Sequence, residues 1–81
     1  MNDLVIRKDH GGVATLTLNR PEKLNALTKD MFEALDEHLM AIAHQVRTIG
    51  LVVLRGAQGH FSSGYDMEEV RQYVEARAKP H

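Results

Sequence analysis

The sequence predicts an α/β fold in which a β-hairpin, a long helix, a third strand and a second helix follow one another. Three observations carry this prediction. Two short runs with strand-like alternation flank a glycine turn, a long run has apolar residues at helical spacing, and a further apolar run precedes a glycine-bearing loop and a second helix-like segment. The 81 residues, 43% of them hydrophobic, suit one small unit over residues 1–81.

The predicted hairpin occupies the N-terminal part of the chain. Its strands are Leu4–Lys8 and Val13–Leu18, and the turn between them is Asp9-His-Gly-Gly12, a strong hairpin signal. In the second strand, apolar residues alternate with Thr15 and Thr17, so the two sets lie on opposite faces. We therefore expect one partly solvated face and one buried face, the latter formed by Ala14, Leu16 and Leu18.

A loop and a long amphipathic helix follow the hairpin. Pro21 disfavours continuing a strand within a sheet, so residues 19–27 should form a loop. Thr28 suits the N-cap of a helix and Asp30 suits its first turn. The helix should run for about five turns and end at Gly50. Its apolar residues recur at steps of three or four: Met31, Leu35, Leu39, Ile42, Val46 and Ile49.

The third strand and the second helix complete the predicted order. Leu51–Leu54 is typical of a buried strand, and a right-handed crossover should place it parallel to a hairpin strand. The second helix should run from about Asp66 to Ala78, with Pro80 compatible with its end. Asp66 is the expected N-cap, and Glu69 is the expected reciprocal acid of a capping box.

The loop between the third strand and the second helix, residues 56–66, is the main candidate site. Its glycines permit close approach of a ligand to the backbone. A helix start leaves N–H groups unpaired, so the N–H near Gly64-Tyr65 is suited to an oxyanion. The alternative is that the glycines only turn the chain. A phosphate loop is excluded because Gly64-Tyr65-Asp66 stands where Gly-Lys-Ser/Thr is required.

Two segments together resemble the crotonase family, the enoyl-CoA hydratase/isomerase superfamily. They are Leu18-Asn-Arg-Pro-Glu-Lys-Leu-Asn-Ala-Leu27 and Phe61-Ser-Ser-Gly-Tyr-Asp66, separated by the predicted long helix and third strand. The resemblance extends from about Leu4 to Val70. It implies that the chain is the N-terminal part of a ClpP/crotonase-like β-β-α superhelix. It also implies hydration of an enoyl-CoA or isomerisation of its double bond, a lyase or isomerase reaction of fatty acid metabolism.

The same resemblance implies the roles of individual residues. The backbone N–H of Tyr65 is one of two oxyanion-hole donors, while the other donor and the acid–base residues come from sequence beyond residue 81. We therefore expect the isolated 81-residue chain to be inactive. Coenzyme A enters as part of the substrate, and no cofactor is bound covalently. The implied acyl-CoA-binding residues are Lys23, Leu24 and Ala26 along the CoA path, and Ser62, Gly64, Tyr65 and Asp66 around the thioester and adenine region.

Simpler structural roles compete with these assignments. Arg20 and Lys23 either meet the CoA phosphates or are exposed charges. Asp66 is most simply a capping residue, and His60 is either a solvated loop residue or an acid–base group. The Tyr65 side chain either shapes an acyl pocket or packs against the protein.

Composition and charge narrow the possible functions further. A net charge of −1 offers no general attraction for nucleic acid or an anionic membrane, and no apolar run reaches the roughly 18 to 20 residues of a membrane span. The absence of cysteine excludes disulfides and thiolate chemistry. The sequence contains no His-Glu-x-x-His motif, so a zinc site is not expected. The N-terminus is a poor signal peptide, so we expect a cytoplasmic protein.

A second hypothesis belongs to a different class of function. A chain that holds only part of a larger fold would leave helix and sheet faces uncovered, and such faces favour association. The alternative to the enzyme is therefore a truncated, non-catalytic module that acts through self-association or pairing with another chain. Among possible assemblies we expect a homo-oligomer.

Overall fold

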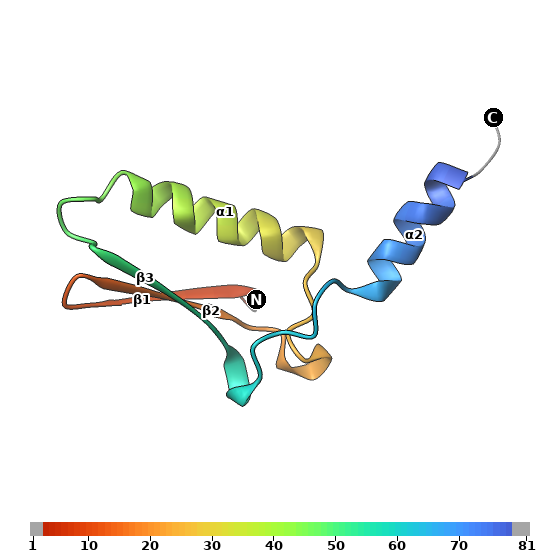
Figure 1. Ribbon diagram of the computed structural model, residues 1–81, viewed down its shortest axis with the longest axis horizontal. Helices are drawn as coiled ribbons and strands as arrows, with labels where there is room; N and C mark the ends of the chain where they lie inside the picture. Colours follow the sequence, from red (N-terminus) through yellow and green to blue (C-terminus); the bar gives the residue numbers. More distant parts are fainter. Residues whose placement is uncertain (1–2, 79–81) are drawn as a thin grey trace.

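A computed structural model describes residues 3–78 and confirms the predicted order of elements (Figure 1). The second helix ends at Ala78, as predicted, and Pro80 lies outside the described residues. The elements are β1 (Val5–His10), β2 (Val13–Leu18), a 3-10 turn (Pro21–Lys23), α1 (Lys29–Ala43), β3 (Leu51–Gly56), a second 3-10 turn (Ala57–Gly59) and α2 (Met67–Ala78).

The three strands form one sheet in the order β1-β2-β3. β1 and β2 are antiparallel, and β3 runs parallel to β2, as the crossover rule predicts. β1 extends to His10, beyond the predicted end at Lys8, because the turn needs only the two residues Gly11 and Gly12. Both glycines have positive φ, +55° and +80°, which a two-residue hairpin turn of type I′ requires.

The core lies between the sheet and α1, which runs along one face of it (Figure 1). The alternation predicted for β2 is confirmed: Ala14, Leu16 and Leu18 are buried, while Thr15 and Thr17 are partly exposed on the other face. The buried cluster therefore combines the inner faces of the hairpin and α1: Val5, Ala14, Leu16, Leu18, Met31 and Ile42.

The predicted end of the first helix is wrong, because α1 stops at Ala43 instead of continuing to Gly50. Its 15 residues span about 22 Å, which already matches the roughly 20 Å length of a six-residue strand. The chain then turns back, and the N–H of Gly50 donates to the carbonyl of Gly12 (2.8 Å) at the start of β3. Val46, predicted to lie on the apolar face, is consequently 75% exposed, and Leu39 is also exposed.

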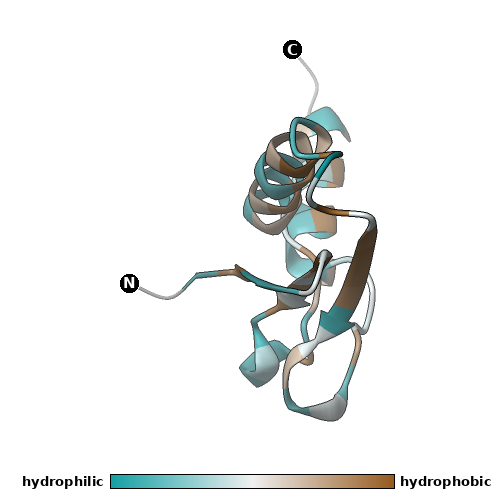
Figure 2. Ribbon diagram, turned by 90° about the vertical axis from the view of Figure 1, so that its left-hand side faces the viewer, coloured by the Kyte–Doolittle hydropathy of each residue, from teal (hydrophilic) through white to brown (hydrophobic). Residues whose placement is uncertain are grey.

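The prediction that the third strand is buried is also wrong. β3 forms an edge of the sheet, and within residues 3–78 it has β2 on one side and no strand on the other. The apolar side chains of Leu51–Leu54 are exposed, and β3 is the apolar brown strand in Figure 2. The cause is position, because α1 packs over β1 and β2 and leaves β3 uncovered.

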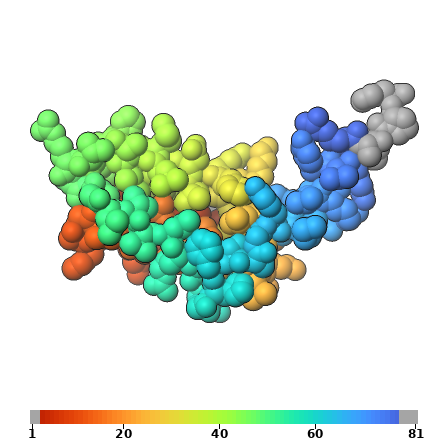
Figure 3. Space-filling view, in the orientation of Figure 1, coloured from red at the N-terminus to blue at the C-terminus, as the bar shows by residue number. Residues whose placement is uncertain are grey.

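α2 projects away from the body formed by the sheet and α1 (Figures 1 and 3). Its apolar residues Met67 and Val74 are exposed, and the molecule is elongated, with extents of 52 × 28 × 22 Å. Neither α1 nor α2, the two α-helices in the described part of the chain, is long and apolar enough to cross a membrane.

Candidate functional site

Two loops that are distant in sequence lie side by side and bring the predicted site residues together. The N–H of Ser63 donates to the carbonyl of Leu24 (3.0 Å), and the N–H of Leu27 donates to the carbonyl of Gly64 (2.8 Å). The N–H of Asp66 in turn donates to the carbonyl of Leu27 (2.8 Å). These backbone bonds hold the segment 23–27 against the segment 62–66, and all the predicted residues lie on these two segments.

Asn25 locks the two loops together and was missed as a site residue, although it lies within the first motif. It is fully buried. Its Oδ1 accepts from the N–H of Arg20 (2.8 Å), and its Nδ2 donates to the carbonyls of Ala57 (3.2 Å) and His60 (2.6 Å). Its φ of +54° is in the left-handed region, which Asn adopts more readily than most residues. Asparagine therefore supplies both the backbone shape and three hydrogen bonds.

Ser62 stabilises the second loop through two hydrogen bonds. Its Oγ donates to the carbonyl of Asn25 (2.7 Å) and accepts from the N–H of Gly64 (3.0 Å). Gly64 has a φ of +96°, a conformation open to glycine and strained for other residues. These two residues thus shape the backbone that leads into Tyr65.

The backbone N–H of Tyr65 faces away from the neighbouring loop. Leu27 and Tyr65 form an isolated parallel bridge, in which the Gly64 carbonyl and the Asp66 N–H both face Leu27. Because backbone groups alternate along an extended segment, the N–H of Tyr65 points to the opposite side. Among residues 3–78 this N–H donates no hydrogen bond to backbone or side chain.

Arg20 and Asp66 form a partly buried ion pair between the loops. Arg20 Nη1 lies 2.7 Å from Asp66 Oδ2 and also donates to the carbonyl of Ala26 (3.1 Å). Arg20 is therefore not an exposed charge, since only 20% of its side chain is accessible. Asp66 Oδ1 accepts from the N–H of Glu69 (3.1 Å), which confirms Asp66 as the N-cap of α2. The Arg20 guanidinium, and then the Glu69 N–H, hold the pKa of Asp66 below its usual value.

The lowered pKa of Asp66 predicts a pH-dependent contribution to stability. A carboxyl group with a lower pKa in the folded chain stabilises it above the unfolded pKa, and this contribution is lost as pH falls through the folded pKa. We therefore expect Asp66→Asn to destabilise the chain at about pH 7 and to differ little from wild type at about pH 2. Urea unfolding at both pH values measures this. Arg20→Gln should weaken the pH dependence, and an unchanged dependence in Arg20→Gln would contradict the ion pair.

The predicted capping box is only half correct. The N–H of Asp66 is occupied by Leu27, so Glu69 does not bond to it; instead Glu69 Oε1 accepts from the N–H of Lys29 (2.8 Å). Thr28 Oγ1 accepts from the N–H of Met31 (3.2 Å), as predicted for an N-cap. Glu69 therefore caps α1 from α2 and ties the two helix starts together.

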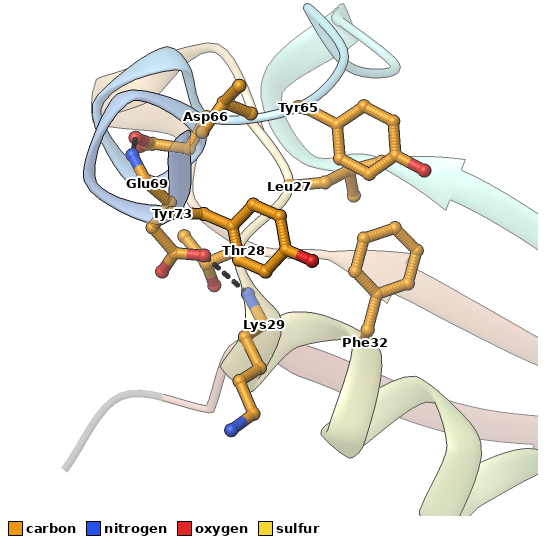
Figure 4. A pocket seen from close by; sticks show the side chains of 9 residues that line it. Leu27, Thr28, Lys29, Phe32, Tyr65, Asp66, Glu69 and Tyr73 are labelled. Atoms are coloured by element: carbon orange, nitrogen blue, oxygen red, sulfur yellow. Dashed lines mark hydrogen bonds between the residues drawn. The ribbon is translucent and has the colours of Figure 1, made fainter. Parts of the chain in front are cut away.

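A pocket of about 300 Å³ opens between these helix starts (Figure 4). The rings of Phe32 and Tyr65 lie with their centroids 5.8 Å apart, and the ring of Tyr73 faces the same space. The full lining is Leu27, Thr28, Lys29, Phe32, Tyr65, Asp66, Glu69, Val70 and Tyr73. The side chain of Tyr65 thus lines this pocket and also packs against Phe32.

Comparison with known proteins identifies the family. The sequence model of the family described as enoyl-CoA hydratase/isomerase matches residues 13–81, most of the chain. The chain belongs to the enoyl-CoA hydratase/isomerase family. This membership confirms the crotonase relationship inferred from the two motifs.

Relatives within the enoyl-CoA hydratase/isomerase family are similar over most of this chain. An ethylmalonyl-CoA decarboxylase of Bos taurus is 36% identical over 66 residues, which are 82% of this chain and 21% of that protein. A probable enoyl-CoA hydratase of Rhizobium meliloti is 35% identical over 69 residues, 85% of this chain and 26% of that protein. The chain thus spans about a fifth to a quarter of these curated relatives. Because they include a decarboxylase and a hydratase, the similarity specifies the family and not one reaction.

Solved structures of family members confirm the fold. The crystal structure of enoyl-CoA hydratase from Mycobacterium tuberculosis H37Rv superimposes with a TM-score of 0.75 at 35% identity, covering 85% of this chain and 31% of that one. An enoyl-CoA hydratase from Thermoplasma volcanium gives a TM-score of 0.77 at 31% identity, covering 93% and 29%. The described residues therefore form part of a crotonase fold.

The remaining candidate residues lie on or beside the two hydrogen-bonded loops. Lys23 ends the first 3-10 turn and is exposed, Leu24 is 55% exposed with a φ of +52°, and Ala26 is buried. His60 is exposed, and its backbone carbonyl accepts a hydrogen bond from Asn25 Nδ2. Within residues 3–78, no group of three His, Cys, Asp or Glu side chains is arranged to hold a metal ion.

Proposed function

We propose that this chain supplies the acyl-thioester-binding part of an enoyl-CoA hydratase/isomerase-like enzyme, with the backbone N–H of Tyr65 as one of two oxyanion donors. The observation that carries the proposal is this N–H, which has no acceptor within residues 3–78 and is held by two cross-linked loops. A donor fixed in place before the reaction stabilises the charge that develops on a thioester oxygen, with little reorganisation. The Asn25, Ser62 and Arg20 contacts provide this rigidity.

The CoA moiety would pass along the first loop. Lys23 and Leu24 are exposed beside the buried Ala26, so a cation and an apolar surface are available to phosphate and to the pantetheine arm. Arg20 is already paired with Asp66, and we assign it to positioning the loops instead of binding phosphate. Coenzyme A is part of the substrate in this proposal, and no covalent cofactor is needed.

The acid–base groups would come from outside the described residues. Asp66 is engaged by Arg20 and by the N–H of Glu69, and Glu69 is engaged by the N–H of Lys29. Both oxygens of Asp66 are occupied, and Glu69 caps α1, so we assign neither carboxylate to proton transfer. We propose that the 81-residue chain binds a thioester without turning it over, and that hydration or isomerisation belongs to the whole enzyme.

Nuclear magnetic resonance of the ¹⁵N-labelled chain tests the oxyanion donor. Crotonyl-CoA should move the Tyr65 amide proton downfield, because a new hydrogen bond to the thioester oxygen deshields it. The matched ligand is the CoA thioether with the same carbon chain, which lacks the carbonyl. It should shift the amides of Lys23–Ala26 and leave that of Tyr65 in place. Equal shifts of Tyr65 with both ligands, or none with crotonyl-CoA, would show that Tyr65 is not the donor.

Association between chains remains a prediction. The open edge of β3 and the exposed apolar residues of α2 are the surfaces that a homo-oligomer, or the alternative non-catalytic pairing module, would use.

A further inference from the structure

Aromatic side chains are concentrated at one place on this chain. It contains two Tyr, two Phe and no Trp, and three of these four residues line the pocket between the starts of α1 and α2. Phe32 comes from α1, Tyr65 from the second loop and Tyr73 from α2 (Figure 4). They are 41%, 67% and 61% exposed, so they are not part of the core. Clusters of exposed apolar side chains mark interaction sites.

Two carboxylates at this pocket are engaged by other parts of the chain. Glu69 accepts from the N–H of Lys29, and Asp66 is held by Arg20. These bonds fix the helix starts and leave the rings facing the open space together with the aliphatic side chains of Leu27 and Val70. The pocket therefore offers a mainly apolar, ring-lined surface.

We propose that this pocket binds an aromatic ring at the end of the acyl group of an acyl-CoA. The inference rests on the proposed function, because the oxyanion donor is the backbone of Tyr65, whose ring lines the pocket. In this proposal, the acyl group of a thioester bound at that N–H extends past the ring of the same residue into the pocket. The pocket volume of about 300 Å³ exceeds the roughly 150 Å³ that suffices for benzene. The tilted rings of Phe32 and Tyr65 accept a third ring edge-to-face.

Calorimetric titration of the 81-residue chain with two acyl-CoA ligands tests the pocket. 3-Phenylpropionyl-CoA should bind about three- to tenfold more tightly than butanoyl-CoA, since ring–ring contacts are specific to the first. Tyr73→Ala and Phe32→Ala should each reduce this preference, whereas Tyr73→Phe keeps the ring and should preserve it. Val46→Ala, which removes an exposed apolar side chain outside the pocket, is the control and should leave both affinities unchanged.

The outcomes separate this inference from the proposed function. If both ligands bind with equal affinity and butanoyl-CoA moves the Tyr65 amide proton, the thioester site stands and the aryl pocket is wrong. A preference that survives both Tyr73→Ala and Phe32→Ala also places the aryl group elsewhere. If neither ligand binds, both proposals are wrong.

Discussion

Replacing Gly56 by alanine should destabilise the chain by about 3 kcal/mol or more, a large part of the stability of a domain of this size. The φ of Gly56 is −111°, which alanine adopts freely, so the cause is space and not backbone conformation. A methyl group would overlap the carbonyl oxygens of His60 and Phe61 and would lie 2.6 Å from the Phe61 Cα. All three atoms belong to the backbone, so no side-chain rotation relieves the clash.

Urea unfolding followed by circular dichroism measures the effect of Gly56→Ala. Gly50→Ala is the matched control, because a methyl group there meets no atom within 4 Å and its φ is not in the left-handed region. It should change the unfolding free energy by less than about 1 kcal/mol. Equal stability of the two variants would mean that the loop after β3 does not pack against Gly56 as described.

Replacing Asn25 by alanine should cost about 3 kcal/mol, because it leaves three partly buried backbone groups without their partner. These groups are the N–H of Arg20 and the carbonyls of Ala57 and His60. Alanine is also strained at the φ of +54°. Asn25→Gly separates the two causes: it relieves the strain and still loses the hydrogen bonds, so it should recover only the smaller part.

The control for Asn25 is Asn19→Ala. Asn19 Nδ2 donates one exposed hydrogen bond, to the carbonyl of Asp3 (2.9 Å), so its loss should cost at most about 1 kcal/mol. The same unfolding measurement applies to both. If Asn25→Ala is no less stable than Asn19→Ala, Asn25 does not lock the loops. In the proposed function, a folded Asn25→Gly chain should also show weaker crotonyl-CoA binding, because the Tyr65 N–H is no longer held.

The parts of the fold that depend on local chemistry were predictable from the sequence. Gly11-Gly12 specifies the hairpin turn because both positions require positive φ. Thr28 caps α1 because its hydroxyl reaches an N–H three residues ahead. The alternation in β2 specifies its buried face because side chains alternate between the two sides of a sheet.

The errors arose where a distant part of the chain decides the outcome. The apolar spacing continues past Ala43, but the length of the sheet and the return to Gly12 end the helix there. The residues of β3 are those of a buried strand, yet their position at the edge exposes them. The apolar spacing of a segment shows which of its faces can be buried. It does not show which other elements will pack against that face.

The candidate site was likewise predictable only where local sequence decides the structure. The two motifs indicated the family, which the comparisons confirm, and the segments that carry them lie side by side. The partner of Glu69 and two of the three partners of Asn25 could not be read from spacing, since they lie 40 and 32 to 35 residues away. A signal for Asn25 existed, because an asparagine in a loop tolerates positive φ and has both a donor and an acceptor.

A crystal structure of the chain with a bound acyl-CoA tests the central proposal most directly, because it locates the thioester oxygen relative to the Tyr65 nitrogen. We expect these two atoms to lie roughly 2.7–3.1 Å apart, with the CoA running along residues 23–26. A thioester oxygen that contacts other groups, or a Tyr65 N–H that donates to a protein acceptor in the complex, would contradict the assignment of this N–H as an oxyanion donor.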